Sequence, residues 1–333
     1  KSYTYEYLDS EGNWKEVPNP SSYGMEALKA QAVCARSYAY IQMMHNKYEA
    51  YGAHVDDSVN FQVYNKQNQT PETVAAVDET KGDIIETYYY STSYGHTGDY
   101  EAWNLDKDAY GYLQGVWVRS EENPIDLSDE KSFLDYISNV DSACYESDLK
   151  YFRWNTVLDF QGKDETLLHT IADRKEHQPE AISYYKDASK TEKTDSCSNF
   201  GSLQAIKVVK RNQSGVILEL ELDFQNGAVS VQSEYNMRAI LGCGITNINL
   251  LDGSSVEMSI LPSAYISIQA KGDGTYAVLG GGYGHGIGMS QNGAQKLCGQ
   301  GFDYKRILNY FYQDTELTEL YQPQNVTKEE GGA

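Results

Sequence analysis

The clearest periodicity of apolar positions lies within residues 24–49. One face of a helix drawn through this segment carries apolar side chains only, namely Leu28, Ala32, Ala35, Ala39 and Met43. A second face is polar and carries Glu26, Lys29, Arg36 and Tyr40. Proline lacks the N–H that a helix needs, so Pro18 and Pro20 stop a helix from running in from upstream, and Gly24 can supply a turn or cap. The pattern predicts one long helix.

Three further segments have β-strand character. Residues 83–94 are rich in β-branched and aromatic side chains and predict a strand, which Gly95 and Gly98 end. Residues 204–223 predict a hairpin, because two strand-like runs flank the turn residues 212–215. Residues 255–279 continue in the same β-rich style.

The remaining segments complete the prediction of the fold. A glycine loop at 280–286 precedes a predicted helix at 290–299 and a short amphipathic helix at 303–312. Residues 119–135 and 173–203 are polar and loop-like, with short helical stretches. The order predicts an α+β fold in which a long N-terminal helix and C-terminal helices form a cleft with a β-rich middle region.

We expect one domain that carries an insertion. Its parts are an N-terminal helix and strand part at 1–118, a polar, loop-rich insertion at 119–203, a β-rich part with the glycine loop at 204–322, and a tail at 323–333.

The charge of the chain excludes some partners. Its 333 residues hold 27 Lys and Arg against 48 Asp and Glu, a formal net charge of −21. Nucleic-acid binding depends on Lys and Arg contacts to phosphates, so we expect no nucleic-acid partner. Anionic membrane surfaces are disfavoured for the same reason, whereas a neutral glycan is not. The acidity is equally consistent with a role in solubility alone.

No apolar run has the length needed to cross a bilayer. The chain starts at Lys1 without a signal core, so we expect membrane contact only through an N-terminal anchor that is missing from this sequence. The five cysteines are scattered and never spaced as CxxC, which argues against a disulfide scaffold or a zinc ribbon. The sequence still allows one pair of them to form a disulfide bond.

The glycine loop is the first candidate site. Six glycines lie within residues 280–288, and no Lys-Ser/Thr pair follows as in a phosphate-binding loop. Four side chains in and after the loop supply a stacking ring and hydrogen-bonding groups suited to a sugar, namely Tyr283, His285, Ser290 and Gln291. A tight turn that holds a hydrogen-bonded histidine is the alternative.

Two other features allow both a functional and a structural interpretation. The polar face of the first helix could be a solvated face with local ion pairs. His96 could ligate zinc with Asp99 and Glu101 as oxygen ligands, although no Cys lies near it in sequence. The chain contains neither a GxSxG nor an HExxH motif.

Seven stretches, taken together, resemble the SpoIID/LytB family of cell-wall proteins in sequence and order. Glu26–Ala39 resembles the family's EALKAQAVAARTYA motif, Ser91–Thr97 its STSGGxT motif, and Cys144–Ser147 with Phe152–Trp154 its YES…RW stretch. Arg211–Gly215 resembles RxxSG, and Arg238–Gly242 resembles IRxxLG. Gly281–Ala294 resembles GRGYGHGVGMSQYGA, and Gly301–Tyr312 resembles GxxYxxILxxYY.

The resemblance implies a function outside the cytoplasmic membrane. The family's founding members are lytic transglycosylases that cleave peptidoglycan between N-acetylmuramic acid and N-acetylglucosamine, in strands stripped of stem peptides, and act with an amidase during engulfment in sporulation. It therefore implies peptidoglycan glycan strands as substrate, an amidase as partner, no cofactor, and a location in the cell wall or in the intermembrane space between forespore and mother cell.

The resemblance breaks at the family's proposed catalytic acid, the Glu of an EMP motif eight positions before Glu26. Pro18 stands there, and Glu16 in Glu16-Val-Pro18 is the displaced candidate, with Glu26 in reserve. Tyr94 also replaces the second glycine of STSGG. Two hypotheses follow. In an active enzyme, Glu16 is the acid, and the cleft is lined by Lys29, Arg36, Tyr38, Tyr283, His285, Ser290 and Gln291. Otherwise the chain binds glycan without cutting it and supports an amidase. A metal-dependent hydrolase acting through His96 is a third hypothesis.

Overall fold

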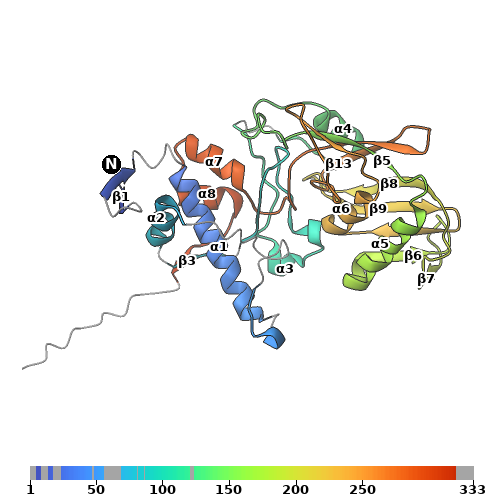
Figure 1. Cartoon of the computed structure of the whole chain (residues 1–333), viewed down its shortest axis with the longest axis horizontal. Helices are drawn as coiled ribbons and strands as arrows, with labels where there is room; N and C mark the ends of the chain where they lie inside the picture. Colours follow the sequence, from blue (N-terminus) through green and yellow to red (C-terminus); the bar gives the residue numbers. More distant parts are fainter. Residues whose placement is uncertain are drawn as a thin grey trace, which may run out of the picture. The chain divides into compact units, whose positions relative to one another are not determined.

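The computed structural model describes residues 5–8, 14–17, 24–46, 49–55, 69–80, 82–85, 87–120 and 124–319 (Figure 1). The chain falls into two compact units, which are described one at a time. Unit 1 comprises residues 1–88, 298–307 and 314–333, and unit 2 comprises residues 89–297 and 308–313. Two helices, α7 (Gln291–Gly299) and α8 (Tyr304–Phe311), contain residues of both units.

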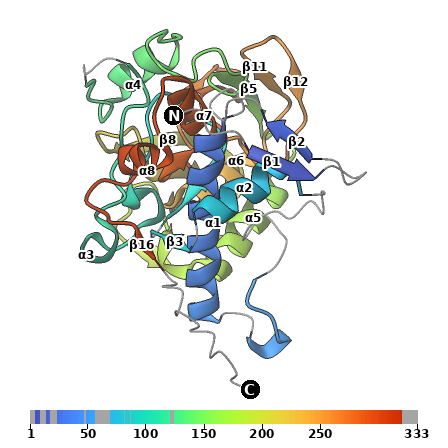
Figure 2. The same ribbon diagram turned by 90° about the vertical axis from the view of Figure 1, so that its left-hand side faces the viewer.

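Unit 1 is built around one long helix, α1, with α2 packed beside it (Figure 2). Its elements are β1 (Tyr5–Leu8), β2 (Trp14–Val17), α1 (Met25–His45), η2 (Glu49–Tyr51), α2 (Pro71–Glu79), β3 (Asp83–Ile84) and β16 (Thr318–Glu319). β1 pairs with β2, and β3 pairs with β16, both antiparallel. Gly24 takes a left-handed conformation (φ 71°) before α1, and Asn46 takes one after it (φ 47°).

The prediction of a helix at 24–49 is confirmed, but its buried face differs from the predicted one. The apolar face drawn from sequence is half-buried down to Ala39, and Met43 is exposed. The buried side chains are Met25, Ala27, Lys29, Ala30, Val33, Cys34 and Ser37. On the polar face, Lys29 is only 8% exposed, whereas Tyr40 is exposed at 38%, so this face is buried in part. Periodicity alone missed this, because small and polar residues here pack against neighbours that are distant in sequence.

Unit 2 contains two antiparallel sheets that share one hydrophobic core. In its described part, five strands run in the order β7-β6-β10-β9-β8 and five in the order β12-β11-β5-β14-β13. Helices α5 and α6 add to the same core, which includes Leu158, Leu167, Ile171, Leu220, Leu222, Val229, Met237, Ile240, Ile248 and Val278. Figure 1 shows α5 and α6 beside β6, β8 and β9.

The elements of unit 2 are, in chain order, β4 (Tyr89–Tyr90), η3 (Tyr100–Trp103), α3 (Lys107–Tyr110), α4 (Glu130–Ile137), β5 (Trp154–Asp159), α5 (Asp164–His177), η4 (Pro179–Ala181), β6 (Ile182–Tyr185), β7 (Lys193–Thr194), β8 (Leu203–Arg211), β9 (Ile217–Phe224), β10 (Gly227–Val231), α6 (Glu234–Gly242), β11 (Ile248–Leu250), β12 (Ser255–Val256), β13 (Ile266–Ala270), β14 (Thr275–Gly280) and β15 (Met289–Ser290).

The α+β prediction is confirmed, including the hairpin of β8 and β9, the β-rich stretch that follows it, and the two C-terminal helices. The single strand predicted at 83–94 is wrong. Its described residues form two separate two-residue strands, β3 and β4, which pair with different partners, and an isolated bridge at Thr92. The polar stretch 119–203 contains α4, β5, α5, β6 and β7. The cleft between the first and last helices stays a prediction.

Two findings bear on the composition. Among the described residues, no disulfide bond joins any of the five cysteines, Cys34, Cys144, Cys197, Cys243 and Cys298. None of the helices in the described part of the chain is both long and apolar enough to cross a membrane.

Arg36 of α1 holds the end of α2 in place. Its guanidinium donates to the carbonyl oxygen of Val77 at 3.1 Å, to that of Thr80 at 3.3 Å and to the Thr80 hydroxyl at 3.1 Å. It also donates to the carbonyl oxygen of Asp83 at 3.0 Å. The last carbonyls of a helix have no partner within the helix, so one planar cation satisfies several of them.

We expect Arg36→Ala to lower the free energy of unfolding by about 2 kcal/mol, because it leaves these carbonyls without their charged donor. Arg36→Lys should not restore it, since an ammonium lacks the planar fork. Chemical denaturation measures both. Arg306→Ala is the matched control, at an exposed arginine of the same unit whose guanidinium lies 4.0 Å from the Phe302 ring centroid, and it should cost no more than about 1 kcal/mol. Unchanged stability in Arg36→Ala would contradict this structural role and favour the predicted substrate contact.

Candidate functional site

The glycine loop and the Ser91–Gly98 segment of unit 2 pair with each other along the backbone. Thr92 and Tyr283 exchange two hydrogen bonds, at 3.1 and 2.8 Å, and the Gly98 N–H donates to the Gly286 carbonyl oxygen at 2.6 Å. β4 and β15 then extend the contact as a short parallel pair. Two of the stretches that resemble family motifs are therefore hydrogen-bonded to each other.

Glycine is required at several points of this loop. Gly284 has φ 116°, and a Cβ there would lie 2.7 Å from the Cβ of Tyr90. Gly286 has φ 82°, and a Cβ there would lie 2.2 Å from the hydroxyl of Tyr265. Both the backbone conformation and the close approach exclude a side chain.

The carboxyl group of Glu146 lies at the centre of this arrangement and is completely buried. It accepts hydrogen bonds from the Ser93 N–H at 3.1 Å, from the Ser93 hydroxyl, and from the Ser290 hydroxyl at 2.7 Å. The two serine oxygens accept in turn from the N–H groups of Gly95 and Gly293, both at 3.2 Å. Glu146 therefore ties three motif-like segments together.

Burial raises the pKa of the Glu146 carboxyl to about 7, although the hydrogen bonds from Ser93 and Ser290 favour its charged form. In the part of the chain that the structure describes, it makes no ion pair. Lys296 exerts a weaker attraction and is itself paired with Asp148 at 2.7 Å. Glu146 has no role in the predictions from sequence, although it lies inside the Cys144–Ser147 stretch.

Ser290 and His285, both predicted to contact substrate, are held by protein groups. Ser290 is 0% exposed and bound to Glu146. Nδ1 of His285 accepts from the Ile287 N–H at 3.1 Å, so Nε2 carries the proton and donates to the Tyr89 carbonyl oxygen, 2.8 Å from Nε2. Burial lowers the pKa of His285 to about 4. These contacts fit a role in shaping the loop.

Of the predicted residues in and after this loop, Tyr283 is half-buried and Gln291 is exposed. The half-buried ring of Tyr283 stacks on Tyr151, with centroids 4.4 Å apart and planes 14° apart. The exposed ammonium of Lys150 lies 5.2 Å from the centroid of Tyr151. Gln291 is exposed at the first residue of α7. An aromatic ring next to polar groups is a suitable surface for a sugar.

His96 is buried, at 5% exposure, and burial lowers its pKa to about 4. Its Nδ1 lies 2.5 Å from the Thr97 carbonyl oxygen, and its ring packs edge-on against Trp117 at 4.6 Å. Among the residues that the structure describes, no three His, Cys, Asp or Glu side chains are grouped so that they could hold a metal ion.

The predicted residues of unit 1 form ion pairs. The Lys29 ammonium lies 2.7 Å from carboxylate oxygens of both Glu26 and Glu79. Burial opposes this charge, but the two carboxylates hold the pKa of Lys29 above its ordinary value. The other oxygen of Glu26 accepts from the Tyr304 N–H at 2.9 Å, at the start of α8, where an anion is favoured. Glu26 thus connects α1 to a C-terminal helix.

Three predicted residues remain. Arg36 holds the end of α2, as described above. Tyr38 is half-buried, with its ring edge-on to Tyr88 at 6.3 Å. Glu16 lies in β2, directly opposite Glu6 of β1, and the Pro18–Tyr23 stretch that follows lies outside the described residues.

We expect Glu146→Gln to change how stability depends on pH. The pKa of Glu146 is about 7 in the folded protein and near 4.5 when unfolded, so between these values the folded state binds more protons. The wild type therefore loses stability as pH rises through this window, and the variant lacks that loss. The variant should gain on the order of 3 kcal/mol relative to the wild type between about pH 5 and about pH 8.

Chemical denaturation across this pH range measures the difference. Glu257→Gln makes the same change at an exposed site and should run parallel to the wild type. Parallel curves for Glu146→Gln as well would mean that Glu146 does not titrate in this window.

Two parts of the chain match protein-family models, and several known proteins are similar to most of its length. Residues 15–88 match the SpoIID family model, described as stage II sporulation protein, and residues 96–288 match a domain of unknown function, DUF8618. The amidase enhancer of Bacillus subtilis (strain 168) is 26% identical over 325 residues, which cover 91% of this chain and 39% of that protein. An uncharacterized protein of Brachyspira hyodysenteriae is 25% identical, with 89% and 62% covered.

Stage II sporulation protein D of Bacillus subtilis (strain 168) is 24% identical over 303 residues, which cover 90% of this chain and 71% of that protein. The chain thus spans less than two thirds of the amidase enhancer and of the Brachyspira protein. Residues 15–88 place this chain in the SpoIID family, and its similarity to the amidase enhancer and to stage II sporulation protein D extends over about 90% of its length.

Proposed function

We propose that this protein binds peptidoglycan glycan strands and cleaves their linkages between N-acetylmuramic acid and N-acetylglucosamine as a lytic transglycosylase. The match of residues 15–88 to the stage II sporulation protein model carries the proposal. The preferred substrate is a strand without stem peptides, and the site of action is extracytoplasmic, in the cell wall or between forespore and mother cell. A neutral glycan also suits a chain with a formal net charge of −21.

The reaction needs one carboxyl group, and we assign it to Glu16. Two other glutamates of the motif-like segments are engaged, since Glu26 binds Lys29 and the start of α8, and Glu146 is completely buried. A general acid must reach the glycosidic oxygen, so neither arrangement favours catalysis. Glu26 stays in reserve, because its side chain is still 22% exposed.

The proton balance of the proposed reaction closes without water. The Glu16 carboxyl group donates its proton to the glycosidic oxygen as the bond from C1 of N-acetylmuramic acid breaks. The resulting carboxylate then accepts the proton of the C6 hydroxyl of the same sugar, while that oxygen bonds to C1. The product is a 1,6-anhydro sugar end, and the acid is regenerated.

The proposed sugar contacts differ in how much support they have. The stacked ring of Tyr283 and the exposed Gln291 suit a direct contact. The predicted contacts by Lys29, Arg36, Tyr38, His285 and Ser290 stay proposals, and all five side chains already have protein partners. Substrate would have to compete with those partners.

A second candidate function is glycan binding without cleavage, in support of a partner amidase. Two observations favour it. Pro18, which cannot donate a proton, stands where the family motif has its glutamate. One relative, which is similar over 91% of this chain, is named amidase enhancer.

Digestion of purified peptidoglycan, both intact and amidase-stripped, tests the proposal. We expect mass spectrometry to detect anhydro-muramic ends, and more of them from stripped strands. Glu16→Gln should lower the release of anhydro-muramic ends by about a hundredfold or more. The variant should still bind the cell wall, as measured by co-sedimentation with it. Glu6→Gln is the matched control, because Glu6 faces Glu16 across the β1–β2 pair, and it should keep activity.

Other results would select another function. Bound but uncut strands in the parent protein would support the non-cutting alternative. Activity that survives Glu16→Gln but is lost in Glu26→Gln would reassign the acid. Reducing ends without anhydro sugars, abolished by a chelator, would indicate a metal-dependent hydrolase and overturn the assignment of a lytic transglycosylase.

A further inference from the structure

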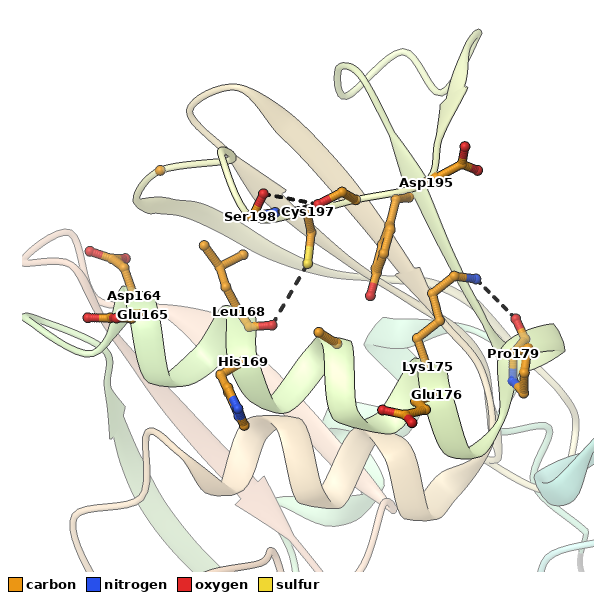
Figure 3. A pocket seen from close by; sticks show the side chains of 14 residues that line it. Asp164, Glu165, Leu168, His169, Lys175, Glu176, Pro179, Asp195, Cys197 and Ser198 are labelled. Carbon is orange, nitrogen blue, oxygen red and sulfur yellow. Dashed lines mark hydrogen bonds between the residues drawn. The ribbon is translucent and has the colours of Figure 1, made fainter.

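A pocket of about 830 Å³ lies in unit 2, between α5 and residues 195–201 (Figure 3). Its volume is in the range of protein ligand sites. None of its lining residues belongs to the motif-like stretches described above. We call it the α5 groove.

Apolar groups form the floor of the α5 groove. Helix α5 is apolar on two sides: Leu167 and Ile171 are buried in the core, whereas Leu168 and Ala172 face the groove. The Cys197 thiol donates to the Leu168 carbonyl oxygen at 3.8 Å and joins the two walls. The ring of Tyr184 completes the floor.

Carboxylates dominate the charge of the α5 groove. Its lining includes four acidic side chains, Asp164, Glu165, Glu176 and Asp195, against a single ammonium, that of Lys175. The ammonium donates to the carbonyl oxygens of Pro179 at 3.2 Å and Ile182 at 2.6 Å and lies over the ring of Tyr184.

Three of the four carboxylates are available to a ligand. Asp164 accepts from the Leu203 N–H at 3.1 Å, whereas Glu165, Glu176 and Asp195 are exposed and form no ion pair with any residue in the described ranges. Figure 3 shows Glu165 and Glu176 at the two ends of α5 and Asp195 on the opposite wall. The rim therefore carries one of these carboxylates near each end of α5 and one on the opposite wall.

We propose that the α5 groove binds a basic, amphipathic peptide segment of a partner protein. Apolar side chains of that segment would lie on the floor, and its Lys or Arg side chains would pair with the rim carboxylates. The length favours a peptide over a small ligand, since the wall from Asp164 to Glu176 is about 18 Å long at 1.5 Å per residue. The inference does not depend on the proposed peptidoglycan activity.

Fluorescence anisotropy with a labelled probe peptide tests this proposal. The probe is a helical peptide of about 12 residues, with leucine at i, i+3 and i+4 spacing and lysine elsewhere. We expect saturable binding that weakens as salt rises from about 50 to about 300 mM. The same peptide with glutamate in place of lysine should not bind.

A matched pair of helix variants locates the site. Ala172→Arg places bulk and positive charge on the floor and should weaken binding by about tenfold or more. Thr166→Arg makes the same change of charge on α5 at an exposed residue outside the groove and should change binding by less than about twofold. Equal effects of the two variants would overturn the proposal. Circular dichroism checks that both remain folded.

A second pair separates the groove from the general acidity of the chain. Neutralising Glu165, Glu176 and Asp195 together should weaken binding by about tenfold. Neutralising the exposed Asp108, Asp135 and Glu257 changes the net charge by the same amount and should have little effect. Equal losses in both triple variants, or the absence of saturable binding in the wild type, would overturn the proposal.

Discussion

The carboxyl group of Glu146 is the contact on which the motif-bearing part of unit 2 depends. Its bonds to Ser93 and Ser290 join segments that are 53 and 144 residues away in the chain. A buried carboxylate without its donors costs several kcal/mol, so these segments have to stay where they satisfy it. These bonds fix the positions of the glycine loop, the Ser91–Gly98 segment and the start of α7, because each segment is bonded to one of the two serines or lies beside it.

Two arginines of the motif-like stretches, Arg153 and Arg211, act in a similar way on backbone carbonyl oxygens. Arg153 donates to the carbonyl oxygens of Tyr94 and Asn139, at 2.8 Å each. Arg211 donates to those of Gly215 and Ile266, at 2.8 and 2.9 Å. Segments without regular structure need such donors, since buried carbonyls must be paired. Much of the resemblance to the SpoIID family therefore records how the fold is held together, and only part of it marks groups that a substrate could reach.

This distinction changes which predicted residues are good candidates for chemistry. Lys29, Arg36, His285 and Ser290 carry polar groups suited to a sugar, yet each of them bonds to the protein itself. Gln291 is exposed, and Tyr283 presents a half-buried ring that stacks on Tyr151. Glu16 is the remaining acid from the sequence-based candidates, on a strand pair outside the helices and loops that carry the other motifs.

The sequence by itself determined the local elements of this protein. Helical spacing located α1, alternating β-prone runs located the β8–β9 hairpin, and the glycine run located the loop, since each depends on neighbours in the chain. Only the tertiary structure decided that Lys29 is buried, that Glu146 bonds to Ser93 and Ser290, and that residues 83–94 split into two short strands with different partners. These outcomes depend on contacts between residues far apart in sequence, where burial and hydrogen-bond partners outweigh the local preference of the chain.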